Sequence, residues 1–291
     1  MRILLIGAGG YLGTAVSERL LRLGHEVVAL IRPEAAEVVG ACECRVGDLA
    51  DPPTLTAAVT PDIDAVIDVA TPLGDRAADA AAIAALTAPL VDTGRGFVYT
   101  SGVWVLGATA DRTADEQSPV NAIPIVGYRP EIERQVLALA DEAVRATVIR
   151  PGLIYGHGGG IPALLVDLAR KFGAPRIIGD RGVRWPMVYI EDLADLFVRV
   201  VTEAPAGTLW HGVAHPAVAV SDLAAAAGAV AGVTTEPVVW PVDEAAAELG
   251  TPFAEALALD QSVSGTAARD RLGWRPEGPN PVVEMLDGSY R

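Results

Sequence analysis

The stretch GAGGYLG, residues 7–13, decides the fold of this chain, because it joins two segments of different periodicity. An apolar run at Arg2–Ile6 precedes it and an amphipathic pattern at Tyr11–Leu23 follows it, which predicts a strand, a tight loop and a helix. The glycines are spaced G-x-x-G-x-x-G, and such a loop lets the backbone approach a pyrophosphate at the amino end of the helix. The stretch therefore predicts a dinucleotide-binding site.

This loop predicts the first cofactor contacts, and the end of the second strand predicts which cofactor is bound. The expected loop contacts are Gly7, Gly9, Gly10, Tyr11, Leu12 and Gly13. The predicted second strand, Glu26–Ile31, is followed by Arg32, which can bind a 2′-phosphate, whereas folds that prefer NAD(H) place an acid there. The sequence therefore favours NADP(H). NAD(H) stays open, because Glu34 lies close by and Arg32 could instead stack on adenine or face solvent.

Apolar runs alternate with helix-like patterns through the first half of the chain. The predicted strands are Arg2–Ile6, Glu26–Ile31, Cys42–Val46, Ala65–Val69, Gly96–Thr100 and Ala146–Arg150. The predicted helices are Tyr11–Leu23, Thr54–Val59, Arg76–Leu90 and Pro130–Val144. Strands that alternate with helices form a parallel sheet covered on both faces, and near-continuous Val, Ile and Leu runs suit such strands. The predicted fold class is α/β, a Rossmann-type doubly wound parallel sheet with a smaller C-terminal substrate lobe.

The composition changes after Arg150, where Gly and Pro become frequent. We expect a short helix at Ile161–Phe172, a strand at Trp210–Val213 that returns to the large sheet, and an Ala-rich helix at Ser221–Gly232 with Ser221 as its N-cap. These segments predict a second lobe. One part of it is inserted into the dinucleotide-binding domain, and the other part follows that domain in the sequence. The predicted division is a dinucleotide-binding domain at residues 1–155, to which residues 188–214 return, and a substrate lobe at residues 156–187 and 215–291.

Composition and charge limit the class of partner. The 291 residues are 51% hydrophobic and carry a formal net charge of −15, which disfavours nucleic acid and anionic membranes, because both carry phosphates. No apolar run approaches the ~20 residues of a membrane helix, and the short apolar start is expected to be a buried strand and not a signal peptide. Cys42 and Cys44 are expected to be reduced thiols. We therefore predict a cytoplasmic protein that acts on a small molecule.

Six further motifs follow the glycine loop in order. They are GDLAD at 47–51, VIDVATP at 66–72, FVYTSGVWVLG at 97–107, VIRPGLIYG at 148–156, MVYIEDLADLF at 187–197 and RDRLGWRP at 269–276. Together with the loop, they resemble the extended short-chain dehydrogenase/reductase family, the NAD-dependent epimerase/dehydratase group, over essentially the whole chain. The resemblance implies an NAD(P)-dependent oxidoreductase or an epimerase-like enzyme. It also implies a homodimer formed by the helices predicted at Arg76–Leu90 and Pro130–Val144.

The resemblance assigns contacts beyond the glycine loop. The implied cofactor contacts are Asp48 and Leu49 at the adenine, Val69, Ala70 and Thr71 along the cofactor, Thr100, and Pro151, Gly152 and Leu153 beside the nicotinamide. The implied walls of the substrate pocket are Trp104, Tyr155, His157, Trp185 and Met187. Because these walls are apolar and aromatic with few charges, they favour an apolar or aromatic substrate over a nucleotide-sugar.

The catalytic residues of the family are the part that this sequence does not reproduce. The family uses a Tyr as general acid/base, a Lys four residues later that lowers the pKa of the Tyr, and a Ser or Thr from the preceding strand. If Tyr128 is the catalytic Tyr, the Lys position holds Ile132. The hydroxyl position holds Gly102, with Thr100 and Ser101 just before it.

A second alignment takes its register from the helix. The family's helix carries a Glu four residues after the Lys and an apolar pair three and four residues further on, and Glu133, Val136 and Leu137 fit that pattern. This register puts Arg129 at the Lys position and Ile125 at the Tyr position. It explains more residues than the first, so we favour it. Neither register gives a Tyr-x-x-x-Lys dyad.

Four residues are candidates for the catalytic work. Arg129 could hydrogen-bond the cofactor ribose but cannot relay protons as Lys does, so Tyr128, Ser101 and His157 are the candidate donors. No metal is expected, because the histidines offer one H-x-x-x-H pair, which spans a loop. Three hypotheses stay open: an NADP-dependent oxidoreductase for a small carbonyl or hydroxyl compound, which we favour, a redox-neutral isomerase, epimerase, dehydratase or cyclase, and a non-catalytic dinucleotide-binding protein.

Overall fold

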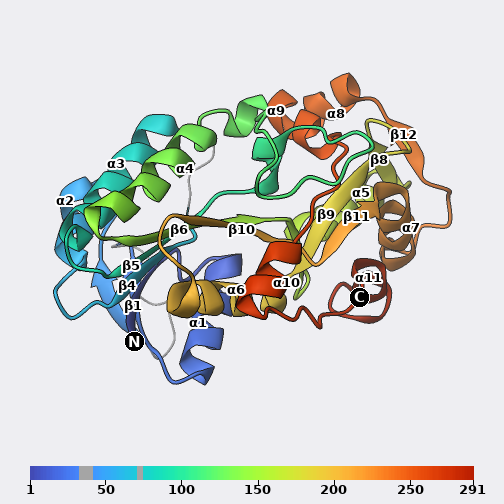
Figure 1. The fold of residues 1–291 in the computed structure, drawn as a ribbon. Helices are drawn as coiled ribbons and strands as arrows, with labels where there is room; N and C mark the ends of the chain where they lie inside the picture. The colour runs from blue at the N-terminus through green and yellow to red at the C-terminus, as the bar shows by residue number, and fades with distance from the viewer. Residues whose placement is uncertain (33–41, 71–74) are drawn as a thin grey trace.

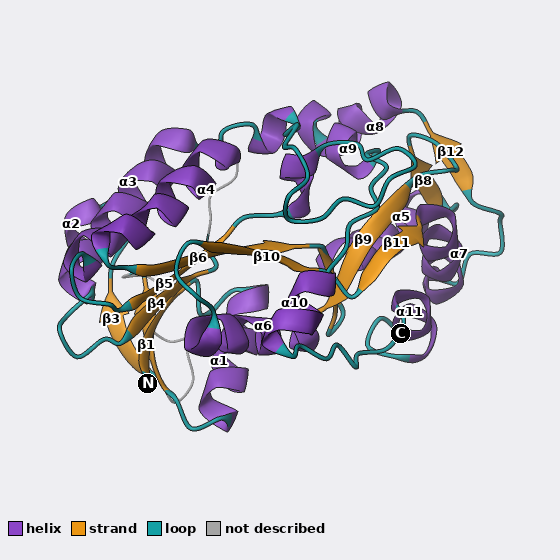
Figure 2. Ribbon diagram, viewed as in Figure 1, coloured by secondary structure: helices purple, strands orange, loops and turns teal. Residues whose placement is uncertain are grey.

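The structure, a computed structural model, describes residues 1–32, 42–70 and 75–291. Its core is a seven-stranded parallel sheet with the order β10-β6-β5-β4-β1-β2-β3 (Figures 1 and 2). The strands are β1 (Arg2–Ile6), β2 (Glu26–Ile31), β3 (Glu43–Val46), β4 (Ala65–Asp68), β5 (Gly96–Thr100), β6 (Arg145–Pro151) and β10 (Thr208–Gly212). This is the strand order of a doubly wound nucleotide-binding sheet with one added strand. The predicted fold class is confirmed, and the predicted returning strand is β10.

Helices cover both faces of the large sheet (Figure 1). One face carries α1 (Tyr11–Arg22), α6 (Ile190–Glu203) and α10 (Thr266–Leu272), and the other carries α2 (Pro52–Ala58), α3 (Arg76–Thr87) and α4 (Arg129–Ala138). An apolar cluster fills the space on each side. Because both faces of the strands are buried, their sequences are almost continuously apolar.

Two of these helices are shorter than their sequence pattern predicts. A short 3₁₀ turn follows α3 after Thr87 and α4 after Ala138. Pro89 has no N–H group to donate in the first turn, and Ala143, with a φ of 54°, turns the chain out of the second and into β6. In the described ranges, no helix combines the length and the apolar character needed to cross a bilayer.

The second lobe lies beside the carboxyl edge of the large sheet and has its own apolar cluster (Figure 2). It contains a three-stranded sheet with the order β11-β9-β7 and a two-stranded sheet of β12 and β8. Its strands are β7 (Leu153–Gly156), β8 (Arg176–Ile178), β9 (Arg184–Tyr189), β11 (His215–Ala219) and β12 (Val238–Trp240). Its helices are α5 (Gly160–Phe172), α7 (Val220–Ala231), α8 (Val242–Leu249), α9 (Thr251–Leu257) and α11 (Pro281–Asp287).

The N-cap predicted for α7 is wrong. The helix begins at Val220, its N-cap residue is Ala219, and Ser221 lies inside the first turn. β11 pairs with β9 as far as Ala219, opposite Arg184. The chain therefore passes from strand to helix without a separate residue that could serve as a polar cap.

Candidate functional site

A cleft of about 580 Å³ opens where β1 and β4 lie side by side, and we call it the glycine-loop cleft. The strand order reverses at this point, and open α/β sheets bind ligands there. Its described lining brings together the predicted cofactor contacts Gly7, Gly9, Gly10, Tyr11, Leu12, Gly13, Arg32, Asp48, Leu49, Val69 and Ala70. Ile6, Leu30, Ile31 and Gly47, which the sequence analysis missed, complete it. Thr71, also predicted, lies outside the described residues.

The glycines of the loop leave room that a side chain would fill. Gly7 has a φ of +83°, and a Cβ atom there would lie 2.7 Å from the Cβ of Ala70. A Cβ atom on Gly13 would lie 1.9 Å from the Gly7 carbonyl oxygen, so α1 approaches β1 more closely than any other residue would allow. Gly10 is the N-cap of α1, and no side chain of the described residues caps this helix. Its first N–H groups are therefore available to an anion such as a pyrophosphate.

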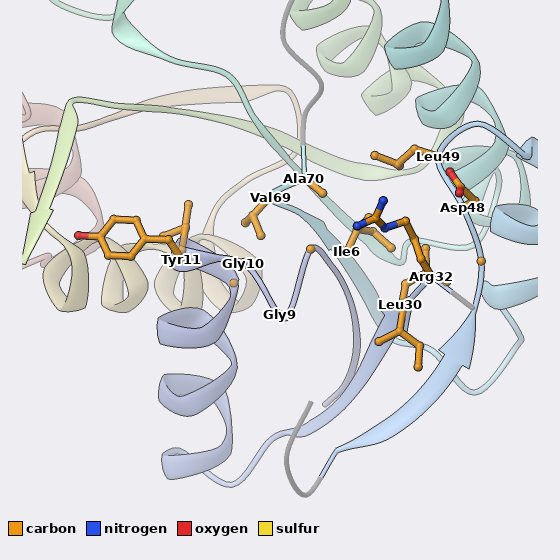
Figure 3. A pocket seen from close by; sticks show the side chains of 15 residues that line it. Ile6, Gly9, Gly10, Tyr11, Leu30, Arg32, Asp48, Leu49, Val69 and Ala70 are labelled. Atoms are coloured by element: carbon orange, nitrogen blue, oxygen red, sulfur yellow. The ribbon is translucent and has the colours of Figure 1, made fainter. Parts of the chain in front are cut away.

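The two ends of the glycine-loop cleft differ in chemistry (Figure 3). Arg32 and Asp48 lie at one end and Tyr11 lies at the other. The Asp48 carboxylate accepts the backbone N–H of Ala50 at 2.8 Å, which holds the turn after β3 in place. Glu34, the residue that kept NAD(H) open in the sequence, lies outside the described residues. The charged end suits an adenosine with its ribose, and the Tyr11 end leads toward the second lobe.

A second pocket of about 410 Å³, which we call the apolar pocket, adjoins the cleft. Tyr11, Leu12 and Val69 line both spaces. The rest of its described lining is Thr100, Ser101, Gly102, Val103, Trp104, Val126, Arg129, Pro151, Gly152, Leu153, Ile154 and Ile161. The pocket therefore brings together the contacts predicted for the nicotinamide end and one predicted wall, Trp104. The sequence does not single out Val103, Val126, Ile154 and Ile161, because nothing in their pattern separates them from ordinary core residues.

Three predicted walls belong instead to the core of the second lobe, and the structure corrects their placement. Tyr155, Trp185 and Met187 are at most 1% exposed and pack in the apolar cluster of that lobe. The Tyr155 hydroxyl donates to the Pro279 carbonyl oxygen at 2.5 Å, and the indole N–H of Trp185 donates to the Leu257 carbonyl oxygen at 3.1 Å. Large apolar side chains on the strands of a small lobe are needed to fill its interior.

The three candidate donors lie in different surroundings. Ser101 is 5% exposed and lines the apolar pocket, and its hydroxyl has no hydrogen-bond partner among the described residues. The Tyr128 side chain lies near Asp79 of α3, whose pKa it lowers, and packs against the apolar cluster there. His157 is on an exposed loop, with Nε2 at 3.0 Å from Glu191 Oε1. Of the three, Ser101 alone is among the described residues that line the apolar pocket.

The orientation of α4 agrees with the second alignment. Arg129, which is 4% exposed, lines the apolar pocket, whereas Ile132 is buried in the cluster beneath α4. Of these two residues, Arg129 is the one that lines the pocket. The chain's one lysine, Lys171, pairs with Glu248 in the second lobe.

Two buried carboxylates accompany Arg129. Asp68, at the end of β4, is 1% exposed and accepts the N–H of Ala70 at 3.0 Å. Burial raises the pKa of Asp68 to about 7, and the neighbouring Asp79 acts in the same direction, while the Ala70 N–H and the Arg129 charge oppose this rise. Burial also raises the pKa of Asp79, which accepts a hydrogen bond from the Tyr99 hydroxyl at 2.8 Å. Asp68 therefore changes its charge near neutral pH.

Replacing Asp68 with Asn is expected to stabilise the protein more at about pH 8 than at about pH 5. The pKa of Asp68 is about 7 in the folded chain and about 3.9 when unfolded. Between these values the folded chain holds a proton that the unfolded chain releases, so the stability contributed by this group falls as pH rises through the window. Asn cannot ionise, and its oxygen can still accept the Ala70 N–H. Thermal melts of both proteins across this range test the prediction, and parallel curves would contradict it.

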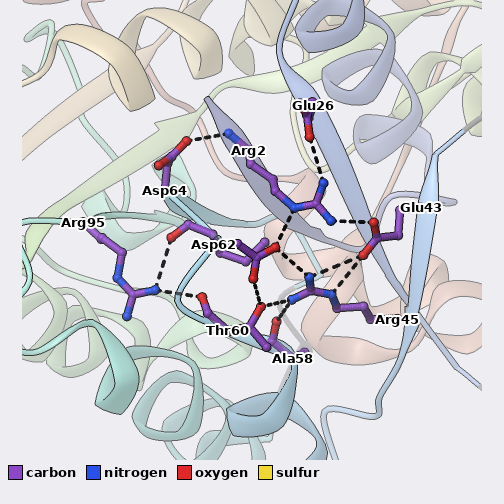
Figure 4. Close-up of polar contacts among 10 residues, drawn as sticks. Arg2, Glu26, Glu43, Arg45, Ala58, Thr60, Asp62, Asp64 and Arg95 are labelled. Atoms are coloured by element: carbon purple, nitrogen blue, oxygen red, sulfur yellow. Dashed lines mark hydrogen bonds and ion pairs between the residues drawn. The ribbon is translucent and has the colours of Figure 1, made fainter.

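An exposed network of charged side chains lies at the amino ends of the strands, opposite the glycine-loop cleft (Figure 4). The Arg2 guanidinium contacts Glu26 at 2.8 Å, Glu43 at 2.5 Å and Asp62 at 2.8 Å, and Arg45 contacts Asp62 at 3.2 Å. The network joins the first residues of β1, β2 and β3, and exposed ion pairs of this kind contribute little stability each. In the part of the chain that is described, no group of His, Cys, Asp and Glu residues could hold a metal ion.

Comparisons with known proteins agree with this geometry. A sequence profile described as the NAD-dependent epimerase/dehydratase family matches residues 3–210. An uncharacterised protein of Schizosaccharomyces pombe is 30% identical over 100% of both sequences. The 2-alkyl-3-oxoalkanoate reductase of Stenotrophomonas maltophilia is 32% identical over 67% of this chain and 63% of its own length. The solved structure of the human epimerase family protein SDR39U1 with NADPH has the same fold, with a TM-score of 0.79 at 20% identity over 99% of both chains.

Proposed function

Because the chain belongs to the NAD-dependent epimerase/dehydratase family, we propose that it is an oxidoreductase that binds a nicotinamide dinucleotide along the glycine-loop cleft and the apolar pocket. The observation that carries this proposal is the continuity of the two spaces, which share Tyr11, Leu12 and Val69. A dinucleotide laid across these residues has its adenosine beside Asp48 and its nicotinamide in the apolar pocket. The bound cofactor supplies or accepts a hydride, and the protein binds it, orients it and excludes water.

We propose NADP(H) as the preferred cofactor, with NAD(H) as the weaker ligand. Arg32 follows β2 and lines the charged end of the cleft, where the adenosine ribose would lie. A guanidinium group binds a 2′-phosphate through paired, charge-assisted hydrogen bonds. Asp48 and Leu49 would flank the adenine, and the open N–H groups at the start of α1 would bind the pyrophosphate.

The nicotinamide half would lie against backbone and apolar side chains in the apolar pocket. Pro151, Gly152 and Leu153 form one side, where β6 passes into β7. Arg129 would hydrogen-bond the nicotinamide ribose from α4, in place of the family's Lys. Thr100 is fixed as part of the wall, because its hydroxyl donates to the Asp68 carbonyl oxygen at 2.6 Å.

The apolar pocket favours a small uncharged substrate. Among its described lining residues, Arg129 is the only one with a charged side chain, and that charge already acts on the buried carboxylates of Asp68 and Asp79. A nucleotide-sugar would bring a pyrophosphate that needs further cations, whereas an alkyl or aromatic ketone, aldehyde or alcohol needs an apolar surface. The relative named as a 2-alkyl-3-oxoalkanoate reductase acts, by its name, on a carbonyl compound with an alkyl chain.

Ser101 is the residue that we propose to hold the substrate oxygen. Its hydroxyl is buried at the wall of the apolar pocket, so a substrate oxygen there would gain a hydrogen bond that does not compete with another described partner. Tyr128 and His157 are not among the described residues that line this pocket, so neither is proposed as the donor. Reduction would add a hydride to the carbonyl carbon while the Ser101 hydroxyl donates its proton to the oxygen and regains a proton from solvent, without a Tyr-x-x-x-Lys dyad.

Binding of NADPH and NADH tests the cofactor proposal directly. Trp104 lines the apolar pocket, so NADPH is expected to quench its fluorescence and Trp104→Phe to remove that part of the signal. NADPH is expected to bind about 10-fold more tightly than NADH, and Arg32→Ala is expected to abolish this difference, because one charge-assisted pair is worth ~1–2 kcal/mol. Calorimetry gives both dissociation constants. If neither nucleotide binds the wild-type protein, the proposed function is wrong.

Turnover is tested in the same protein with a panel of small alkyl and aryl aldehydes and ketones. Substrate-dependent oxidation of NADPH is expected, with a loss of about 100-fold in kcat for Ser101→Ala, as for other single oxyanion donors. Ser221→Ala, in the first turn of α7, is the matched control. NADPH binding without consumption, but with conversion of a compound, would favour the redox-neutral alternative.

A further inference from the structure

The loop that leads from the end of β7 into α5, residues 156–160, has an unusual backbone. Four of its five residues have positive φ values: Gly156 at 112°, His157 at 49°, Gly158 at 67° and Gly160 at 71°. This conformation is unfavourable for His157, which has a Cβ atom. A loop of this kind holds one conformation when hydrogen bonds from other segments fix it.

Tyr290 and Ser289 supply those hydrogen bonds. The Tyr290 hydroxyl accepts the N–H of Gly156 at 2.6 Å and donates to the carbonyl oxygen of Gly159 at 2.8 Å. The Ser289 hydroxyl accepts the N–H of Gly158 at 2.7 Å. Tyr290 is 7% exposed, and burial raises its pKa to about 12, so its hydroxyl keeps the proton that it donates. A single side chain thus satisfies two backbone groups at the two ends of the loop.

The same loop contacts the glycine-loop cleft through Tyr11. The Tyr11 hydroxyl donates to the carbonyl oxygen of Gly156 at 2.7 Å. Gly156 is therefore held on its N–H side by Tyr290 and on its carbonyl side by Tyr11. The Tyr11 ring also packs against Gly159, where an added Cβ atom would lie 2.5 Å from a ring carbon. The two phenol hydroxyls are near enough that each affects the pKa of the other.

Tyr11 in turn lies where the two halves of the cofactor site meet. It is the first residue of α1, and it lines both the glycine-loop cleft and the apolar pocket. Any movement of its ring would change the space over the first turn of α1, where the pyrophosphate would lie. The charged end of the cleft, at Arg32 and Asp48, is on the far side from Tyr11 (Figure 3).

We propose that Tyr290 is a positioning residue for the cofactor site, which acts through Gly156 and Tyr11 on the pyrophosphate and nicotinamide half of the dinucleotide. The inference rests on the proposed function, because it concerns the affinity for that cofactor. Without the Tyr290 hydroxyl, Gly156 loses a buried backbone hydrogen bond and Gly159 loses a partly buried one. The loop then shifts and Tyr11 loses its fixed acceptor. The adenosine end of the site is not touched by this change.

The test compares Tyr290→Phe, Tyr11→Phe and the double variant with the wild-type protein. Calorimetry measures the dissociation constants of NADPH and of adenosine 2′-monophosphate, which carries only the adenosine half. Tyr290→Phe is expected to weaken NADPH binding about 10-fold and to leave adenosine 2′-monophosphate binding within about twofold of wild type. Both hydroxyls act on Gly156, so their effects should not add. The double variant is therefore expected to bind NADPH about as tightly as the single variant that binds it less tightly.

Tyr155→Phe is the matched control. It removes a buried tyrosine hydroxyl from the same lobe, but its partner is Pro279 and not the 156–160 loop. It is expected to lower the melting temperature as Tyr290→Phe does, with unchanged NADPH binding.

The outcomes show whether the positioning role of Tyr290 fails alone or together with the proposed function. If wild-type protein binds neither NADPH nor NADH, both fail. If wild type binds NADPH, three results would each overturn the positioning role while the proposed function stands. In the first, Tyr290→Phe binds NADPH as tightly as Tyr155→Phe does. In the second, Tyr290→Phe loses as much affinity for adenosine 2′-monophosphate as for NADPH. In the third, the losses of NADPH affinity in the two single variants multiply in the double variant.

Discussion

Gly13→Ala is expected to weaken NADPH binding at least ~100-fold, a loss of about 2.7 kcal/mol in binding free energy. The new Cβ atom would lie 1.9 Å from the Gly7 carbonyl oxygen and 2.9 Å from the Ala8 Cα. Both are backbone atoms of the loop itself, so no rotation of a side chain relieves the clash. α1 must move away from β1, and the N–H groups at its start move with it. Affinity falls because those groups are the site proposed for the pyrophosphate.

The measurement is NADPH affinity together with the melting temperature. Gly10→Ala provides a graded comparison, because its Cβ atom would lie 3.2 Å from the Gly7 carbonyl oxygen and needs a smaller shift. Gly182→Ala is the control, since its Cβ atom would approach only the Asp180 side chain in an exposed turn. If Gly13→Ala folds and binds NADPH as Gly182→Ala does, the glycine loop is not the pyrophosphate site.

Glu133→Gln is expected to destabilise the fold by about 3–5 kcal/mol, because it leaves a buried guanidinium without its main countercharge. Arg150 binds Glu133 through two hydrogen bonds, Nε to Oε1 at 2.8 Å and Nη2 to Oε2 at 2.5 Å. Their side chains are 5% and 4% exposed, so water cannot replace the lost partner. The charge of Glu116 also acts on Arg150 and offsets part of the loss.

Urea denaturation of Glu133→Gln against wild type measures this loss. Asp287→Asn is the control, because it breaks the Arg291–Asp287 pair, whose side chains are 66% and 68% exposed, and it is expected to cost under ~1 kcal/mol. Equal effects of the two substitutions would contradict the prediction. In the sequence, Arg150 directly precedes Pro151 and Gly152, which line the apolar pocket.

The large sheet was predictable because its signals are local. The bounds predicted for β1, β2 and β5 are those of the structure, and β3, β4 and β6 differ by one residue at one or both ends. Buried parallel strands are short apolar runs, and glycines and helix patterns separate them. The contacts of the glycine-loop cleft were predictable for the same reason, because motifs at the carboxyl ends of parallel strands meet at one edge of the sheet.

The pocket walls were harder to predict, because their roles depend on pairing between distant strands. Tyr155 and Trp185 are aromatic residues of the kind that line pockets, yet the pairing of β7 and β11 with the central strand β9 places both in the core of the second lobe. Tyr128, a candidate donor in the sequence, is not among the described residues that line the apolar pocket. The homodimer, the cytoplasmic location and the division into two domains stay predictions.

The sequence by itself determined the doubly wound sheet, the glycine loop and most of the residues that line the glycine-loop cleft, because each is encoded in a short run of residues. It also determined that no Lys follows Tyr128 by four residues. Only the tertiary structure decided that Arg129 lies near two buried carboxylates and that Ser101 faces the apolar pocket. Only the tertiary structure joined Tyr290 to Gly156, 134 positions away in the sequence. Such contacts form when separate elements pack together, and no local pattern specifies them.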